Sequence, residues 1–140
     1  MTTRSVATAI AFLATGLGAG SSAPANFAEV WVPLEIEVAI LRDPALIQYF
    51  HLDTPGRLPV KVSARLSHPD LESADLGYSV KLVPEGSSEA AEAFQFGAYE
   101  VSAHHAAVDV SYPIEGVFGR YSLVRRGKHW VVKSRSLREQ

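Results

Sequence analysis

The chain has 140 residues, of which 47% are hydrophobic and 20% are charged, and its formal net charge is −2. This composition is typical of one globular domain, too small to divide into two, and argues against long disordered tracts. Cysteine is absent, which excludes disulfides, thiolate metal ligands and a cysteine nucleophile.

The first 25 residues predict a secretory signal peptide. A basic start is followed by a short apolar run at residues 6–17 and by a small-residue A-x-A pattern that ends at Ala25. The apolar run is too short to span a bilayer comfortably. We expect cleavage between Ala25 and Asn26, which would leave residues 26–140 as a secreted or periplasmic domain without a membrane span. An uncleaved anchor or a buried N-terminal helix is the alternative.

Charge is unevenly distributed along the remaining chain. Residues 26–112 contain 13 acids and five bases, whereas residues 113–140 contain two acids and seven bases. Such an asymmetry can mark a binding surface, although the two parts can also neutralise one another in the fold.

The segment that precedes His51 contains two conflicting patterns. Apolar residues alternate from Val30 to Ile40, which favours a strand, but they also recur at helical spacing, so this part stays open between strand and helix. Asp43 and Pro44 form a good N-cap and first-turn pair. We therefore expect helical structure from Asp43 to His51.

Two shorter strands are expected next. Residues 58–66 (LPVKVSARL) alternate apolar with polar side chains, as in a half-buried strand. Residues 78–83 are a weaker candidate, and a turn-rich segment separates the two. The loop at residues 84–93 (PEGSSEAAEA) is compatible with a helical turn.

The C-terminal part predicts three consecutive hairpins. A two-residue type II′ turn at Gly127-Lys128 pairs Arg126 with His129, Val124 with Val131, Ser122 with Lys133, and Arg120 with Arg135. A four-residue loop at 113–116 pairs Tyr112 with Val117, Val110 with Gly119, Asp109 with Arg120, and Val108 with Tyr121. A turn at His104-His105 pairs Val101 with Val108, Tyr99 with Val110, Gly97 with Tyr112, and Glu100 with Asp109.

These pairings separate apolar from charged side chains on the predicted sheet. One face carries an apolar set: Tyr99, Val101, Val108, Val110, Tyr112, Tyr121, Leu123, Trp130 and Val132. The other face carries a charged row across four strands: Glu100, Asp109, Arg120 and Arg135. Because like charges placed opposite each other cost stability, we expect Asp109 to offset the contact between the two arginines.

The predicted fold class is α+β, with N-terminal helical structure packed on a curled, mainly antiparallel meander sheet of about 4–6 strands. The long hairpins within residues 94–137, with the connection YPIEGVFGRYSLVRRG, give this chain a shape that resembles the cystatin-like and NTF2-like cone folds. The resemblance implies an architecture alone. Proteins of this shape include enzymes, ligand binders and protein-binding modules, so no functional residue is carried over.

Patterns for catalysis or metal binding are weak. The sequence has no nucleophile elbow and no glycine-rich phosphate loop. Glu100 and Asp109 form the best acid pair, which could divide acid and base roles or hold a hard cation, although a charge ladder is the favoured interpretation. An exposed turn at His104 and His105 is favoured over a zinc or copper site. We expect no cofactor and no metal, and lean towards a protein that is not an enzyme.

Two functions follow as hypotheses. The first is a binding protein, with an inhibitor or immunity-type protein as one concrete version, that presents its charged face to an acidic patch of a partner protein and does not bind nucleic acid. The residues expected to bind are Arg120, Arg126, Lys133, Arg135, Phe118 and Leu137. The alternative is a cone-shaped small-molecule binder or enzyme with a pocket lined by Tyr99, Tyr112, Tyr121 and Trp130, although core packing is the favoured interpretation of these aromatic residues.

Overall fold

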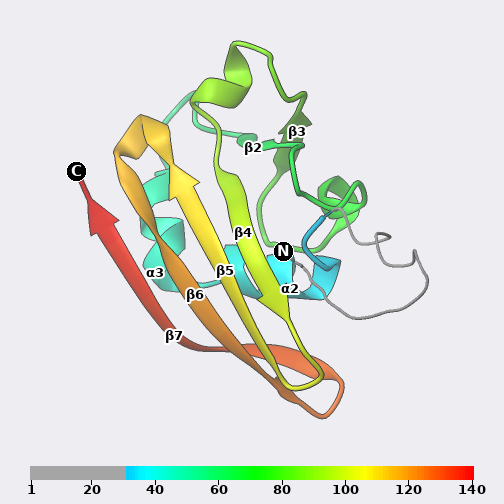
Figure 1. The fold of residues 1–140 in the computed structure, drawn as a ribbon. Helices are drawn as coiled ribbons and strands as arrows, with labels where there is room; N and C mark the ends of the chain where they lie inside the picture. The colour runs from blue at the N-terminus through cyan, green and yellow to red at the C-terminus, as the bar shows by residue number, and fades with distance from the viewer. Residues whose placement is uncertain (1–30) are drawn as a thin grey trace.

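The computed structural model describes residues 31–140, so the predicted signal peptide and its cleavage site lie outside the described residues. A four-stranded antiparallel sheet in the order β4-β5-β6-β7 carries helices on one face, and a two-stranded parallel sheet, β2-β3, lies at one end (Figure 1). The four-stranded sheet is open, so the α+β class is confirmed but a closed, curled sheet is not. No helix within residues 31–140 is long and apolar enough to cross a membrane.

The open question at Val30 to Ile40 is answered by helix α2, which spans Leu34–Leu41. Its fully buried residues are Ile36, Glu37, Ile40 and Leu41. They form two adjacent pairs, each with members four residues apart, and so lie along one stripe of the helix. The alternating pattern was misleading, because apolar residues outside this stripe are also half-buried against neighbouring segments.

The predicted helical structure after Asp43 is confirmed. Helix α3 spans Pro44–Ile47 and continues as a 3-10 turn, η2, at Gln48–Phe50. Asp43 is the N-cap, and its Oδ1 accepts a hydrogen bond from the backbone N–H of Ala45 at 3.4 Å. The turn ends at His51, whose φ of +52° is left-handed and stops the helix.

Strands β2 (Val60–Ser63) and β3 (Val80–Val83) fall inside the two predicted upstream strands. They pair in parallel rather than antiparallel, which the sequence did not predict. Their connection contains a 3-10 turn, η3, at Leu71–Ser73, and a further 3-10 turn, η4, at Glu89–Ala91 confirms the helical turn expected before Phe94.

The main sheet consists of β4 (Gln95–Val101), β5 (His105–Tyr112), β6 (Val117–Arg126) and β7 (His129–Glu139). The 3-10 turn η5 at Pro113–Glu115 links β5 to β6. All four pairings predicted between β5 and β6 are confirmed. Gly127 has a φ of +63° while Lys128 has no positive φ, as the predicted type II′ turn requires.

The predicted pairing of β6 with β7 is correct only near the turn. Arg126 faces His129 and Val124 faces Val131, but a bulge then shifts the register at Ser122 and Leu123. Ser122 therefore faces Ser134 instead of Lys133, and Arg120 faces Ser136 instead of Arg135. A bulge adds one residue to one strand, so every later residue of β7 lies on the face opposite to the one predicted.

The predicted pairing of β4 with β5 is shifted by two residues. The backbone N–H of Ser102 bonds the carbonyl of His105 at 2.8 Å, so the turn is at Ala103-His104 and β5 already begins at His105. The observed partners replace the predicted ones as follows: Tyr99 faces Val108, Glu100 faces Ala107, Val101 faces Ala106, and a bulge between Phe96 and Tyr99 leaves Gly97 without its predicted partner Tyr112.

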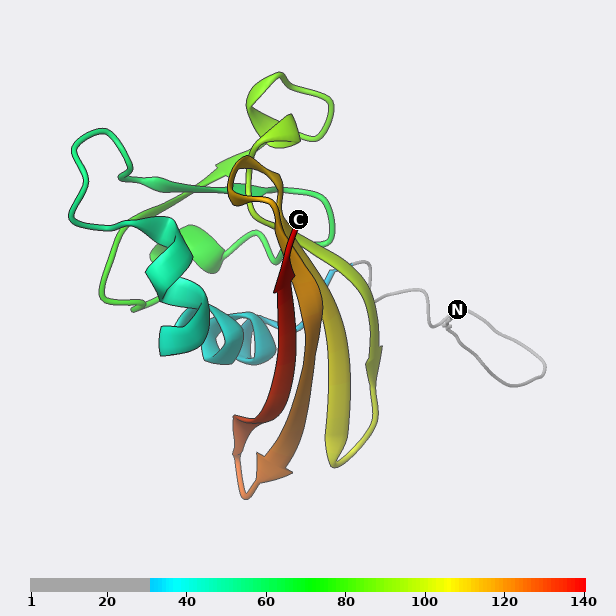
Figure 2. The same ribbon diagram turned by 90° about the vertical axis from the view of Figure 1, so that its left-hand side faces the viewer.

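The core lies between the helices and one face of the main sheet (Figure 2). Phe94 packs edge-to-face on Phe50 and Phe96, with ring centroids 5.8 and 5.1 Å apart. Tyr121 is fully buried and Tyr112 is 6% exposed. The predicted apolar face is therefore largely correct, except that Val101 lies near the sheet end and is 41% exposed.

Gly119 marks the closest approach of β6 to β7. A Cβ added there would overlap the backbone oxygen of Ser136 and lie 2.9 Å from the Cα of Leu137. We expect Gly119→Ala to push the strands apart and to lower the free energy of unfolding by roughly 2–3 kcal/mol. Gly127→Ala is the matched control, because no atom lies within 4 Å of its Cβ and only its left-handed backbone costs about 1 kcal/mol. Urea denaturation measures both, and equal losses would contradict this close approach.

Candidate functional site

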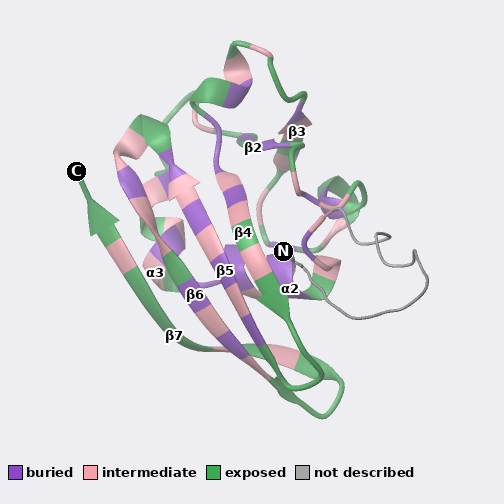
Figure 3. Cartoon of the chain, in the orientation of Figure 1, coloured by how far each residue is buried: buried purple, intermediate pink, exposed green. Residues whose placement is uncertain are grey.

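The side of the main sheet that faces away from α2 and α3 is the outer face, and it is the first candidate surface. Figures 1 and 2 show both helices on the opposite side, so within residues 31–140 no helix covers the outer face. Buried and more exposed residues alternate along β5 and β6 (Figure 3), as expected for a sheet with one packed side. The register assigns to the outer face Asp109, Ser111, Phe118, Arg120, Ser122, Val124, Arg126, Val131, Ser134, Ser136 and Arg138.

Two pairs of side chains organise the charge on this face. Arg120 donates to Asp109 at 2.5 Å, as the predicted register requires, and both side chains are almost half exposed. The guanidinium of Arg138 lies over the ring of Phe118, 4.8 Å from its centroid. No carboxylate within residues 31–140 forms an ion pair with Arg126 or Arg138. These two cations therefore remain available to a partner.

Two residues predicted for this surface lie on the other side of the sheet. Arg135 faces Tyr121 across the ladder and reaches Asp43, because the β7 bulge reverses its direction. Leu137 faces Gly119 and packs against the core for the same reason. Phe118, Arg120 and Arg126 stay on the outer face. Lys133 is exposed at the bulge itself.

The predicted acid pair is not formed. Glu100 faces Ala107, whereas Asp109 lies opposite Arg120, with its Cβ 3.2 Å from the position that a Cβ of Gly97 would take. The two carboxylates are thus diagonal neighbours rather than direct partners, and Asp109 is engaged by Arg120. Within residues 31–140 no group of three or more potential metal ligands comes together, and His104 and His105 are both exposed.

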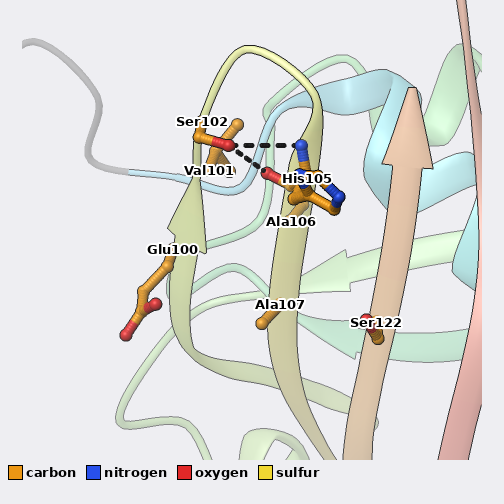
Figure 4. Close-up of a pocket in the computed structure, with 7 residues that line it drawn as sticks. All are labelled: Glu100, Val101, Ser102, His105, Ala106, Ala107 and Ser122. Atoms are coloured by element: carbon orange, nitrogen blue, oxygen red, sulfur yellow. Dashed lines mark hydrogen bonds between the residues drawn. The ribbon is translucent and has the colours of Figure 1, made fainter.

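A shallow depression of about 250 Å³ lies at the end of the outer face, near the β4–β5 turn (Figure 4). Its lining residues are Glu100, Val101, Ser102, His105, Ala106, Ala107 and Ser122. The Ser102 hydroxyl is engaged by the backbone of His105, and Glu100 points away from that histidine. Because its polar groups do not converge, the depression lacks the character of a ligand pocket.

The aromatic residues of the alternative pocket contribute to the core. Tyr112 and Tyr121 are buried, while Tyr99 and Trp130 are half-buried and pack against the same cluster. The hydroxyl of Tyr99 donates to the carbonyl of Trp31 at 3.0 Å. Their positions favour packing over ligand binding.

A buried network joins the helices to the sheet. Oδ2 of Asp43 accepts hydrogen bonds from the Tyr121 hydroxyl at 2.6 Å and from Nε of Arg135 at 2.5 Å. Burial, together with the hydrogen bond to Asp43, raises the pKa of Tyr121 above its ordinary value, so this hydroxyl remains a donor. The sequence identified Asp43 as a helix cap, but nothing in it indicated these two partners.

Glu37 is the most unusual ionisable residue among those described, because it is fully buried on α2 without a cationic partner. The Ser67 hydroxyl donates to one carboxyl oxygen at 3.0 Å, and the backbone N–H of His68 donates to the other at 2.7 Å. Burial raises its pKa to about 8, although both hydrogen bonds oppose the shift. Leu66, the residue before Ser67, has a φ of +62°, a conformation that L-residues rarely adopt.

A third polar cluster ties two loops together at the other end of the sheet. Nε2 of His51 lies 3.1 Å from Oε1 of Glu115, and Arg57 donates to Oε2 of the same carboxylate at 3.0 Å. Arg57 also donates to the Tyr112 hydroxyl at 3.3 Å. Partial burial raises the pKa of Glu115, but the contacts with His51 and Arg57 outweigh this effect and hold that pKa below its usual value. These groups satisfy one another, which is typical of a structural link.

No protein-family model, no curated protein and no solved structure matches this chain.

Proposed function

We propose that this protein is a non-catalytic, secreted or periplasmic binding protein that engages an acidic partner protein through the outer face. The observation that carries the proposal is the uncovered outer face, on which Arg138 stacks on Phe118 and Arg126 has no carboxylate partner among the described residues. Export would depend on the predicted signal peptide at residues 1–25. Inhibition or neutralisation of an enzyme in that compartment is one concrete form of this function.

The composition of the outer face supports protein binding. Arginine and aromatic side chains dominate the binding energy of protein interfaces, and stacking holds an arginine in place at little further entropic cost. The Arg120–Asp109 pair neutralises itself, and Arg126 and Arg138 outnumber Glu100, a further carboxylate that the register places on this face, so the charge on the outer face is positive. Electrostatic complementarity of this kind mainly sets association rate and specificity.

The alternative, a small-molecule binder or enzyme with a pocket between helix and sheet, has less support. The residues that would line such a pocket pack in the hydrophobic core, and the depression in Figure 4 lies at the end of the outer face instead. The proposal therefore assigns binding to the surface.

Charge reversal at the outer face tests this function. Poly-L-glutamate is a suitable acidic probe at about 20 mM salt, where screening is weak. We expect Arg126→Glu combined with Arg138→Glu to weaken its binding by about tenfold or more, since each change turns an attraction into a repulsion. Fluorescence anisotropy with labelled polymer measures the affinity.

The matched control is Lys61→Glu combined with Lys81→Glu, which changes the net charge equally on the parallel β2–β3 sheet. This variant should stay within about twofold of the unmodified protein, because it leaves the outer face intact. Equal losses in the two double variants would show that only net charge matters, and would remove the outer face from the proposal.

A further inference from the structure

β7 leaves one edge of the main sheet open. It pairs only with β6 in the sheet order, and Figure 2 looks directly onto its other edge, where no described segment lies against it. The strand spans 11 residues, His129–Glu139, about twice the usual strand length. An edge of this length presents a row of unpaired backbone groups and is a template for a further strand.

The part of β7 beyond its bulge is the most suitable template. The bulge at Lys133 interrupts the ladder, and the regular pairing that follows runs from Ser134 to Glu139. All of these residues are exposed except Leu137, which is half-buried. In an antiparallel ladder every second residue turns its N–H and C=O away from the neighbouring strand, so this segment offers backbone groups to a fifth strand.

The charges beside this edge favour an acidic strand as its partner. Lys133 and Arg138 have no carboxylate partner within the described part of the chain. A second copy of the chain would present the same segment, whose residues 133–138 (KSRSLR) contain three cations and no carboxylate, so that segment could not neutralise them. A strand with carboxylates on its outer side would instead pair its charges with them.

We propose that an extended acidic segment of the partner protein adds to β7 as a fifth, backbone-paired strand along residues 134–138. This inference rests on the proposed function, because it assumes the same acidic partner, and it specifies how that partner binds. Main-chain hydrogen bonds would provide affinity, while the alternate side chains that lie beside Arg138 would provide specificity.

The test uses a defined probe, a ten-residue capped peptide with alternating glutamate and threonine, together with two N-methylated forms. One form is N-methylated at every glutamate and the other at every threonine. The two forms carry the same charge, and in each of them the N–H groups along only one edge of the extended peptide are blocked. Strand addition requires the free N–H groups of one edge, so we expect one form to lose at least about tenfold in affinity and the other to retain it. Hydrogen exchange should slow in residues 134–138 of the complex.

Each result separates strand addition from the proposed function. Equal binding by the two methylated forms, or protection of β4 instead of β7, would overturn strand addition and leave binding through the outer face in place. If the peptide without N-methyl groups does not bind, and poly-L-glutamate does not bind either, both strand addition and the proposed function are overturned. A dimer of this chain in solution with protected β7 amides would assign the edge to a second copy and would also refute the inference.

Discussion

Glu37→Gln is expected to stabilise the protein at alkaline pH and to leave its stability almost unchanged near pH 4.5. The expected gain at pH 9 is on the order of 3–5 kcal/mol in the free energy of unfolding, since one pKa unit corresponds to about 1.4 kcal/mol and burial raises the pKa of Glu37 from 4.5 to about 8. Urea denaturation at about pH 4.5, 7 and 9 measures the difference between the variant and the unmodified protein.

The direction follows from proton linkage. The pKa of Glu37 is raised by burial from 4.5 to about 8 in the folded protein, so the folded state keeps a proton that the unfolded state releases between these values. The contribution of Glu37 to stability is therefore highest below pH 4.5, falls as the pH rises through this window, and stays low above about pH 8. Glutamine remains neutral throughout, and its amide can serve both Ser67 and the backbone N–H of His68.

Glu35→Gln is the matched control, because Glu35 lies on the same helix but is exposed. It should leave the pH dependence unchanged. Other titrating groups are common to all these proteins and cancel in the difference between variants. A Glu37→Gln variant that differs from the unmodified protein by the same amount at every pH, or that is less stable at pH 9, would show that burial does not raise the pKa of Glu37 in the folded protein.

The β5–β6 hairpin could be predicted from sequence because two independent signals agree there. The loop at 113–116 has the length of a common hairpin connection, and the register it sets places Val108, Val110 and Tyr121 together on the core side. A slip by one residue would have exposed them all. This consistency gave the correct contact between Asp109 and Arg120, which is the part of the candidate surface that the sequence placed best.

The positions of Arg135 and Leu137 could not be predicted, because a bulge leaves little trace in the sequence. On both sides of Lys133 the chain alternates in an acceptable way, so a continuous ladder and a bulged one look alike. Only tertiary contacts distinguish them: the bulge directs Leu137 to the core and Arg135 to Asp43. In the same way, the β4–β5 turn could move by one residue and still keep each apolar side chain on its face.

Glu37 and the partners of Asp43 were also beyond reach of the sequence. A glutamate within an apolar helix is normally expected to be exposed to solvent, and Ser67 and His68 lie 30 and 31 residues further along the chain in a turn-rich segment. Such contacts depend on how the segment after β2 folds back over α2. No local pattern encodes that path.

Asp43→Ala is expected to cause the largest loss of stability among the substitutions considered, roughly 3–5 kcal/mol in the free energy of unfolding. Three losses coincide: the cap of α3, the acceptor of the buried Tyr121 hydroxyl, and the counter-charge of Arg135. An unsatisfied buried hydroxyl accounts for about 1–3 kcal/mol and a lost cap for about 1 kcal/mol. Because the Arg135 side chain is 39% exposed, water screens its lost partner, and this contribution is the smallest. Urea denaturation measures the loss.

Asp43→Asn removes the charge but keeps one acceptor, because its single amide oxygen can take the place of Oδ2 and accept from Tyr121 while the amide NH2 in the place of Oδ1 no longer caps α3. Its expected cost is about 1–2 kcal/mol, well below that of the alanine variant. Arg135→Met tests whether Arg135 contributes to stability and not to binding. Since Arg135 faces the helices, we expect this variant to lose about 1 kcal/mol of stability. It should bind poly-L-glutamate as well as the unmodified protein does. If Arg135→Met instead weakened that binding as strongly as the Arg126 and Arg138 reversals, the acidic partner would have to contact the helix side of β7, and the division of the sheet into a packed side and a binding side would fail.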